Sequence, residues 1–259
     1  MTLKWLALAL CLFLIPFSAR SQQVPAGDPQ AVALAARALA ALTAATPVND
    51  ITLTGTAIRT AGSDIESGSI TLKALGNQAS RFDLALASGT RSEIRNASGG
   101  VPQGSWIAPD GVSHAMANHN MYTDAAWFAP QLTVLSQLSN PNLTLSYIGQ
   151  ETRAGVPVQH LHFAFQPAVA DPTGLIQGLS TEEVYLDAST FLPVAFSFNT
   201  HPDNDAGTNI PVEIDFSNYQ QVNGVQIPFH VQKFLNGTLF LDVTIQSAVL
   251  NSGIPTSDF

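Results

Sequence analysis

The sequence predicts a mainly β protein of the α+β class, built on one broad antiparallel sheet that curls on itself. Three observations lead to this fold class. Apolar and polar residues alternate with a period of two between about residues 51 and 246, as is typical of strands with one buried and one solvated face. Turn-forming pairs such as Asp110-Gly111 and Asn223-Gly224 separate these segments. Only two segments have helical spacing, too few to cover an open sheet of many strands.

The beginning of the chain is typical of an export signal. Lys4 precedes an apolar run over residues 5–15, and small residues follow this run. The run is shorter than the ~20 residues that a membrane-spanning helix needs. We therefore expect a cleaved signal peptide over residues 1–21, a periplasmic location and a soluble mature chain. The single cysteine, Cys11, lies within the apolar run, so the mature chain is expected to have no disulfide and no thiolate site.

The composition argues against several classes of partner. Of the 259 residues, 46% are apolar and 11% are charged, against roughly 25% charged residues in an average soluble domain. The 19 acidic residues outnumber the 10 basic ones, and the basic residues do not cluster in the sequence. Nucleic-acid binding needs a basic stripe, and docking on an anionic membrane surface needs a polybasic segment. The sequence predicts neither of these partners.

The first element after the signal is predicted to be a helix over residues 29–45. Asp28 fits the N-cap and Pro29 fits the first helical position, while Thr46-Pro47 ends the pattern. The apolar stripe predicted for this helix consists of Val32, Ala35, Ala36, Leu39 and Leu42. Its alanines favour close packing against a sheet or against the mouth of a barrel.

From residue 51 the apolar period changes from 3.6 to 2, which predicts about eleven antiparallel strands. The strands with the clearest alternation carry the apolar residues Ile51 and Leu53; Ile70 and Leu72; Phe82, Leu84 and Leu86; Val184 and Leu186; Val194, Phe196 and Phe198; Val212, Ile214 and Phe216; Val225, Ile227, Phe229 and Val231; and Leu239, Leu241, Val243 and Ile245. Residues 167–181, rich in Pro, Gly and Asp, are predicted to form a loop.

A segment in the middle of the chain, residues 121–138, departs from the strand pattern. Its large apolar side chains recur at roughly helical spacing, and Pro130 can begin a helix. We expect a turn or short helix over about residues 124–129 and a second helix over about residues 130–138. We call residues 121–138 the insert, and we expect it to cover the interior of the curled sheet.

A curled sheet of this size can enclose an apolar cavity that binds a ligand. Each predicted strand has an apolar face that must be buried, and two short helical segments cannot bury all of them. The pattern alone leaves open the alternative of a fully packed sandwich without a cavity.

The sequence carries no complete motif for catalysis or metal binding. It has six histidines, but no H-E-x-x-H, H-x-x-E-H or cysteine pair that would hold zinc. His160 and His162 are expected on the solvated face of a strand, opposite Leu161. There is no G-x-S-x-G elbow, Walker A loop or dinucleotide fingerprint. The interpretation is a protein without enzyme activity, cofactor or metal, although a Ser-His-Asp triad stays open because such triads occur in any chain order.

The most specific pattern lies near the C-terminus. Tyr219 precedes a V-x-G-V-x-I-P run over residues 222–228, and the chain ends in an L-N-x-x-I…F pattern over residues 250–259. A unit consisting of a strand, an Asp, a turn, Leu-Pro and a second strand lies upstream. Over about residues 180–259 the chain resembles the LolA/LolB-like superfamily of periplasmic, outer-membrane lipoprotein-sorting proteins, and elsewhere it is similar in architecture.

This resemblance implies an incomplete antiparallel β-barrel, closed by helices, with an apolar cavity that receives acyl chains. It implies a single LolA-like domain over residues 22–259 that acts as a periplasmic carrier. The implied partners are lipid or lipoprotein acyl chains and a membrane-protein donor or acceptor. Burial of a methylene group contributes ~0.8 kcal/mol, so acyl chains could bind without a charged anchor.

Alternating strand positions and the insert supply the expected ligand contacts. The strand residues are Leu53, Leu72, Leu84, Phe196, Phe198, Phe216, Leu241 and Val243. The insert residues, Trp127, Phe128, Leu132 and Leu135, are expected to form a movable cover. The same alternation builds a plain hydrophobic core, so this alternative stays open.

Two other functions also stay open at the level of sequence. An exported hydrolase would use a polar cleft around Asp110, His114, His119 and His160. A structural or sensor module would present its sheet to a partner protein and would have a tightly packed interior.

Overall fold

The computed structural model describes residues 26–98, 101–166 and 171–259, so the expected signal peptide and Cys11 lie outside the described residues. Within these ranges the strands form one fourteen-stranded sheet, in the order β1-β8-β9-β10-β11-β12-β13-β14-β2-β3-β4-β5-β6-β7. Only the pairing of β1 with β8 is parallel in this described sheet. The predicted class, mainly β with an antiparallel sheet, is confirmed.

The strand bounds follow the predicted alternation closely. The strands are β1 (Ala26–Gly27), β2 (Asp50–Ala61), β3 (Asp64–Leu75), β4 (Ala79–Leu86), β5 (Gly89–Ser98), β6 (Val101–Ile107), β7 (Ser113–Ala115), β8 (Leu143–Arg153), β9 (Val156–Phe165), β10 (Glu182–Asp187), β11 (Pro193–Thr200), β12 (Ile210–Val222), β13 (Val225–Leu235) and β14 (Thr238–Leu250). The prediction of about eleven strands is too low. Two strands, β1 and β7, are too short to show a period, and Pro102 and Gly104 interrupt the pattern in β6.

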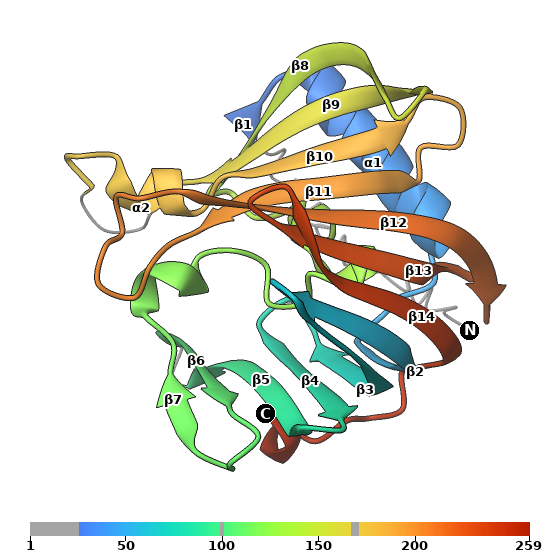
Figure 1. Ribbon diagram of the computed structural model, residues 1–259. Helices are drawn as coiled ribbons and strands as arrows, with labels where there is room; N and C mark the ends of the chain where they lie inside the picture. Colours follow the sequence, from blue (N-terminus) through green and yellow to red (C-terminus); the bar gives the residue numbers. More distant parts are fainter. Residues whose placement is uncertain (1–25, 99–100, 167–170) are drawn as a thin grey trace, which may run out of the picture.

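The sheet curls so that its two halves face each other (Figure 1). We call the space between the facing halves, which side chains fill, the hollow. The halves join where β14 pairs with β2, from Leu241 opposite Arg59 to Leu250 opposite Ile51. Gly55 lies in this seam, and a Cβ atom there would collide with the carbonyl oxygen of Thr244. The edge strands β1 and β7 lie at opposite ends of the sheet order and do not pair with each other. The barrel is therefore incomplete, as the sequence resemblance implied.

The N-terminal helix, α1 (Pro29–Thr43), begins where the sequence predicted and ends two residues earlier. Asp28 Oδ1 accepts a hydrogen bond from the backbone N–H of Gln30 at 2.8 Å, which confirms the predicted N-cap. At the other end Ala44 adopts a left-handed conformation, with φ of 46°. This residue turns the chain out of the helix before the predicted boundary.

The predicted apolar stripe of α1 is partly wrong. Ala35 and Leu42 are buried as expected, but Val32 and Leu39 are only half-buried and Ala36 is exposed. The buried face consists of Ala31, Leu34, Ala35, Ala38 and Leu42. It packs against β8, β9 and β13 and against the insert. Small alanines let the helix backbone approach its neighbours closely, so the alanine face is buried in preference to the face with the larger side chains.

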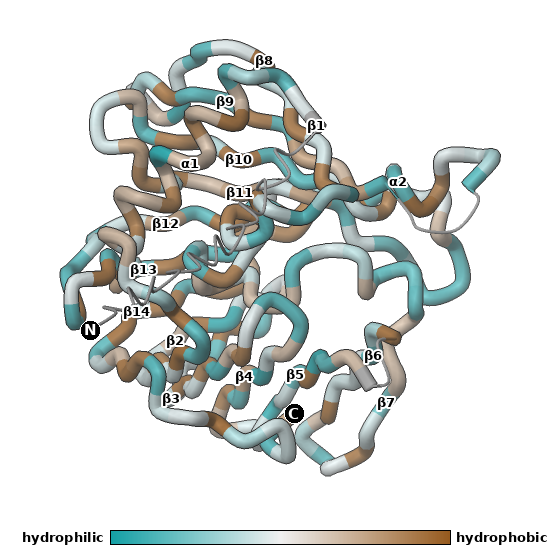
Figure 2. Tube along the Cα trace, turned by 180° about the vertical axis from the view of Figure 1, so that it is seen from behind, coloured by the Kyte–Doolittle hydropathy of each residue, from teal (hydrophilic) through white to brown (hydrophobic). Residues whose placement is uncertain are grey.

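The core lies between the inward face of the sheet, α1 and the insert. Cross-strand partners such as Leu53 and Leu72 share this inward face, and both are fully buried. Polar residues alternate with them along the strands (Figure 2). Within the predicted loop, a short helix, α2 (Leu175–Leu179), was not expected. Among the described helices, none has the length and apolar character required to cross a membrane.

The insert departs most from the prediction. A turn over residues 125–128 agrees with the turn or short helix expected over about 124–129. Two 3₁₀ helices, η2 (Pro130–Leu132) and η3 (Val134–Gln137), replace the single helix expected over about 130–138, and a further one, η1 (Asn118–Met121), leads into the insert. Pro130 begins η2 as predicted, but Thr133 is extended, with φ −93° and ψ −163°, and interrupts the helical path. Each residue from 124 to 135 is buried. The insert is therefore shaped by the space that it fills rather than by its own helical period.

Candidate functional site

The sheet interior and the insert meet in one apolar cluster, to which all twelve predicted ligand contacts belong. Leu53, Leu72, Leu84, Trp127, Phe128, Leu132, Leu135, Phe196, Phe216, Leu241 and Val243 are buried in this cluster, and Phe198 is partly buried against it. The structure thus brings residues from β2, β3, β4, β11, β12 and β14 together with four residues of the insert. The side chains of the insert occupy the hollow, so we refer to this arrangement as the closed state.

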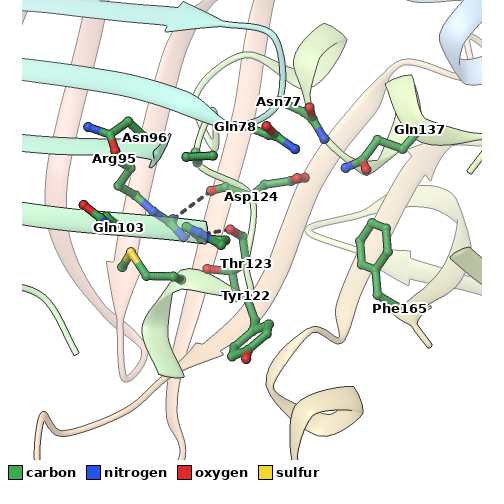
Figure 3. Close-up of a pocket in the computed structure, with 14 residues that line it drawn as sticks. Asn77, Gln78, Arg95, Asn96, Gln103, Tyr122, Thr123, Asp124, Gln137 and Phe165 are labelled. Atoms are coloured by element: carbon green, nitrogen blue, oxygen red, sulfur yellow. Dashed lines mark hydrogen bonds between the residues drawn. The ribbon is translucent and has the colours of Figure 1, made fainter. Parts of the chain in front are cut away.

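A buried arginine holds the insert to the first half of the sheet. Arg95 on β5 is only 6% exposed. Its guanidinium donates to the backbone carbonyls of Thr123 and Asp124, at 2.8 and 3.1 Å (Figure 3). It also donates to the backbone carbonyl of Asn120 at 3.1 Å. The Arg95 side chain therefore holds the start of the insert by its backbone carbonyls. This contact does not depend on the side chains of the three acceptor residues.

A pair of buried carboxyl groups holds the same part of the insert to the other half of the sheet. The backbone N–H of Asp124 donates to Glu182 Oε1 on β10 at 2.7 Å, and Asp124 Oδ2 accepts from the backbone N–H of Val134 at 2.7 Å. Burial raises the pKa of Asp124 to about 6. Burial, together with the nearby Asp124 carboxylate, raises the pKa of Glu182 well above its ordinary value. The pair therefore retains a proton under conditions in which exposed carboxyl groups are ionised.

A third contact anchors the middle of the insert. The Gln131 side chain donates from Nε2 to the backbone carbonyl of Gln226 on β13. Its Oε1 atom is buried without a hydrogen-bond partner among the described residues, as is Glu182 Oε2. Unpartnered buried oxygens destabilise a structure, so these two oxygens make the attachment of the insert weaker than a fully hydrogen-bonded one would be.

Two small cavities lie beside the insert. The first, of about 180 Å³, lies between the insert, the β3–β4 turn, β5, β6 and the end of β9 (Figure 3). Its polar lining is mainly carboxamide, from Asn77, Gln78, Asn96, Gln103 and Gln137. The second, of about 140 Å³, shares Arg95 and Thr123 with the first and is also lined by Trp127 and Phe198. Both are smaller than the ~300–1,000 Å³ of typical ligand pockets, so neither can hold an acyl chain in the closed state.

The four residues of the predicted hydrolase cleft do not come together. Asp110 accepts from the Val112 N–H in a turn, and His114 stacks on Trp106. His119 contacts the Pro202 carbonyl, whereas His160 contacts Glu183. β7, which carries His114, and β9, which carries His160, lie at opposite ends of the molecule (Figure 1). This arrangement gives no common cleft for catalysis.

The solvated face of β9 matches its prediction. His160 and His162 are half-buried, and Leu161 between them is fully buried on the other face. Both imidazoles contact one carboxylate, that of Glu183, at 2.8 and 2.7 Å. The hydrogen bond with Glu183 raises the pKa of His162. The described residues include no group of three or more His, Cys, Asp and Glu side chains arranged to hold a metal ion.

A chain of Ser, His and Asp, which the sequence pattern did not reveal, crosses three strands on the outward face. Ser217 Oγ lies 2.9 Å from His230 Nδ1, and His230 Nε2 lies 2.8 Å from Asp242 Oδ1. Ser217 and His230 are direct cross-strand partners on β12 and β13. Alternation places each residue on the solvated face, but only the strand register shows that they meet. Ser217 is exposed on the sheet surface, and it lines neither of the cavities beside the insert, so we assign the chain to cross-strand stabilisation.

The fold of this chain is similar to that of several solved structures. No protein-family model matches the sequence, and no curated protein matches it. A solved domain from Vibrio parahaemolyticus assigned to outer-membrane lipoprotein sorting is 12% identical, with a TM-score of 0.56 over 88% of this chain and 95% of that chain. A LolA superfamily protein from Nitrosomonas europaea is 10% identical, with a TM-score of 0.54 over 88% and 96% of the two chains. A DUF1329 family protein from Desulfovibrio piger is 11% identical, with a TM-score of 0.53 over 89% and 95%.

These similarities extend over most of the chain. They show that it has the fold of the LolA superfamily, which the C-terminal sequence pattern had indicated.

Proposed function

We propose that this protein is a periplasmic carrier that holds the acyl chains of a lipid or a lipoprotein under the insert. One observation carries the proposal. The hollow of the curled sheet is filled by residues 124–135, a segment without α-helix or strand, and polar contacts fasten this segment to both halves of the sheet. A core made only of regular elements would have no part that could leave without unfolding the sheet.

If the insert moved out and an acyl chain took its place, the apolar face of the sheet would stay covered. Each methylene that moves from water into the hollow contributes ~0.8 kcal/mol, so an acyl chain of ordinary length offsets the loss of the insert's apolar contacts. The strand residues Leu53, Phe196 and Leu241 would then contact the ligand instead of the insert. Trp127, Phe128, Leu132 and Leu135 would move with the insert as its cover.

We infer binding without catalysis. The side chains that suggested a hydrolase have separate partners, as described above for His114 and His160. The similar fold of the Vibrio parahaemolyticus domain, which is assigned to outer-membrane lipoprotein sorting, supports a carrier role. No cofactor enters the proposed function.

The proposed location and partners follow from the nature of the ligand. An acyl chain needs cover to cross an aqueous compartment, and the sequence of residues 1–21 predicts export. We propose that residues 22–259 act as one domain, which takes the chain from a membrane-protein donor and delivers it to an acceptor. If the protein is instead a structural module, the insert should stay closed over the sheet interior at all times.

Bound lipid and its effect on the insert provide the test. The protein is extracted from cells under mild conditions and weighed by native mass spectrometry, where we expect a mass increment that organic solvent removes. In the mature chain of residues 22–259, the substitution Trp106→Phe leaves Trp127 as the single tryptophan. Titration of this variant with an acyl amphiphile should change its emission with saturation.

Hydrogen exchange then distinguishes a moving cover from surface adsorption. Ligand should speed amide exchange in residues 121–138 and leave β2 and β14 unchanged. No bound lipid, no saturable change of Trp127 emission and no faster exchange would together refute the carrier function and favour the structural module.

A further inference from the structure

Lys233 occupies a position on β13 where the strand pattern predicts an aliphatic side chain. The apolar residues Val225, Ile227, Phe229 and Val231 precede it at two-residue spacing. Its cross-strand partners are Ile214 on β12 and Leu241 on β14, and both are buried in the core. Directly paired residues point to the same face of a sheet. Lys233 therefore faces the hollow.

The Lys233 side chain lines the second cavity, of about 140 Å³, next to the insert. The apolar lining of this cavity comes from Met116, Trp127, Phe198, Val212, Leu235 and Phe240. The charged groups that face it besides Lys233 are Glu93 and Arg95 on β5. Two cations thus meet one carboxylate here, although the whole chain has a formal net charge of −9.

The ammonium of Lys233 has no carboxylate partner within 4.0 Å among the described residues. The other lysine of the described ranges, Lys73, forms an ion pair with Asp258 at 2.6 Å. The Nζ atom of Lys233 lies instead 4.5 Å from the centre of the Trp127 ring. Desolvation by burial lowers the pKa of Lys233, and Glu93 only partly opposes this effect.

Arg95 is already engaged in hydrogen bonds in this structure. Both of its terminal nitrogens donate to backbone carbonyls of residues 120, 123 and 124. Lys233 is instead the cation at this cavity that has neither an ion-pair nor a hydrogen-bond acceptor among the described residues, and its one contact is with the Trp127 ring.

Movement of the insert would remove that partner. A cation–π contact contributes roughly 0.5–2 kcal/mol, and Lys233 is half-buried, so its ammonium is only partly hydrated in this structure. A carboxylate or phosphate would replace the ring with a stronger, charge-assisted hydrogen bond. Movement of the insert therefore frees the Lys233 ammonium to bind an anionic group.

We propose that Lys233 binds the anionic head, a carboxylate or a phosphate, of the acyl ligand. The inference rests on the proposed carrier function and narrows its ligand class to a fatty acid or an anionic lipid. An acyl chain joined through a neutral ester or amide would leave Lys233 without a counter-ion. The head group then lies at the cavity, while the chain enters the apolar hollow beside Leu241.

Three amphiphiles that share one chain length test the head group: decanoate, decyl phosphate and the uncharged monodecanoylglycerol. Their dissociation constants are measured by calorimetry on the wild type, on Lys233→Met and on Lys233→Arg. Lys73→Met serves as the matched control, because it removes a lysine that already has an ion-pair partner. For the wild type we expect at least one anionic amphiphile to bind about tenfold more tightly than the neutral one, or about 1.4 kcal/mol. The stronger of the two anions identifies carboxylate or phosphate as the head.

Lys233→Met should remove this preference without weakening the neutral amphiphile, whereas Lys233→Arg and Lys73→Met should retain it. An equal preference in Lys233→Met and in the wild type would overturn the inference. So would a wild type that binds all three amphiphiles equally, an outcome that leaves the carrier function intact. Failure of the wild type to bind any of the three would instead contradict the carrier function. If Lys233→Met does not fold, the wild-type preference and its retention in Lys233→Arg decide the question.

Discussion

The backbone N–H of Asp124 and the carboxyl group of Glu182 are joined by a hydrogen bond of 2.7 Å between the insert and β10. The two residues are 58 positions apart in the chain, and both side chains are buried. Their pKa values are raised, mainly by burial. The attachment of the insert is therefore coupled to the protonation of this pair.

The stability of the protein should fall as pH rises through the titration of the pair. An acid whose pKa is higher in the folded than in the unfolded state binds its proton more tightly when folded, so deprotonation favours unfolding. For Asp124 the decline runs from its ordinary pKa of 3.8 to about 6, and Glu182 extends it to higher pH. Glu182→Gln supplies a neutral side chain that still accepts from the Asp124 N–H. We expect it to raise stability at pH 7.5, on the order of 1–2 kcal/mol, and to have little effect at pH 4.5.

Urea unfolding at several pH values measures this effect. Glu151→Gln, at an exposed position on β8, is the control and should leave the pH dependence unchanged. A wild-type midpoint that does not fall between pH 4.5 and 7.5, or a Glu182→Gln variant with the wild-type slope, would show that the pair does not share a proton.

Arg95→Met should release the insert while the rest of the sheet stays folded. The substitution leaves three backbone carbonyls without their donor, and each unsatisfied buried group costs ~1–3 kcal/mol. Amide exchange in residues 118–138 should accelerate far more than exchange in β2 or β14. The exposed Arg37, which stacks 3.7 Å from the centre of the Phe191 ring, provides the control variant Arg37→Met. Uniform acceleration across the sheet would mean that Arg95 supports the whole fold and not the insert in particular.

Gly55→Ala should weaken the seam between the two halves of the sheet. The added Cβ would collide with the carbonyl oxygen of Thr244 on β14, so the β2–β14 pairing must shift. We expect a loss of ~2 kcal/mol or more in the free energy of unfolding, measured with urea. A Cβ atom added at Gly178 in α2 would meet no neighbouring atom within 4 Å, so Gly178→Ala should be neutral. Equal midpoints for the two variants would contradict the close approach at Gly55.

The pKa of His162 should depend on Glu183. Its carboxylate lies 2.7 Å from His162 Nδ1 and raises the pKa of that imidazole. A raised histidine pKa stabilises the folded protein fully below the unfolded pKa, near pH 6.5, and the stabilisation is lost as pH rises through the folded value. Glu183→Gln should lower the pKa of His162, as followed by NMR titration. Glu66→Gln on β3 is the control, and a pKa of His162 unchanged by Glu183→Gln would assign the shift to another cause.

Local rules account for the elements that the sequence predicted well. Asp28 and Pro29 define the start of α1 because capping depends on adjacent residues. The strand faces follow from a period of two, which requires no knowledge of the partner strands. The same rule could have identified Lys233, since it continues the inward row that ends at Val231.

Features that depend on long-range geometry could not be predicted. The Asp124–Glu182 contact joins residues 58 positions apart in the chain. The Ser217–His230–Asp242 chain requires the register of the neighbouring strands β12, β13 and β14, which alternation alone does not give. The insert resembled a helix because its apolar residues recur at helical spacing. Burial on all sides and the extended Thr133 produced short 3₁₀ turns instead. Tertiary packing overrides local propensity most easily in such a fully enclosed segment.

The pairing of β14 with β2 has a consequence for how the chain acquires its shape. These two strands, the last and nearly the first, form the middle of the sheet order. A polypeptide is synthesised from its N-terminus. β2 can therefore pair with β3 early, but it can pair with β14 only after nearly all of the remaining residues have been made. Such distant pairing makes folding slow, which keeps a nascent chain unfolded for longer. Under the proposed export, this delay would keep the chain unfolded until its passage through the membrane is complete.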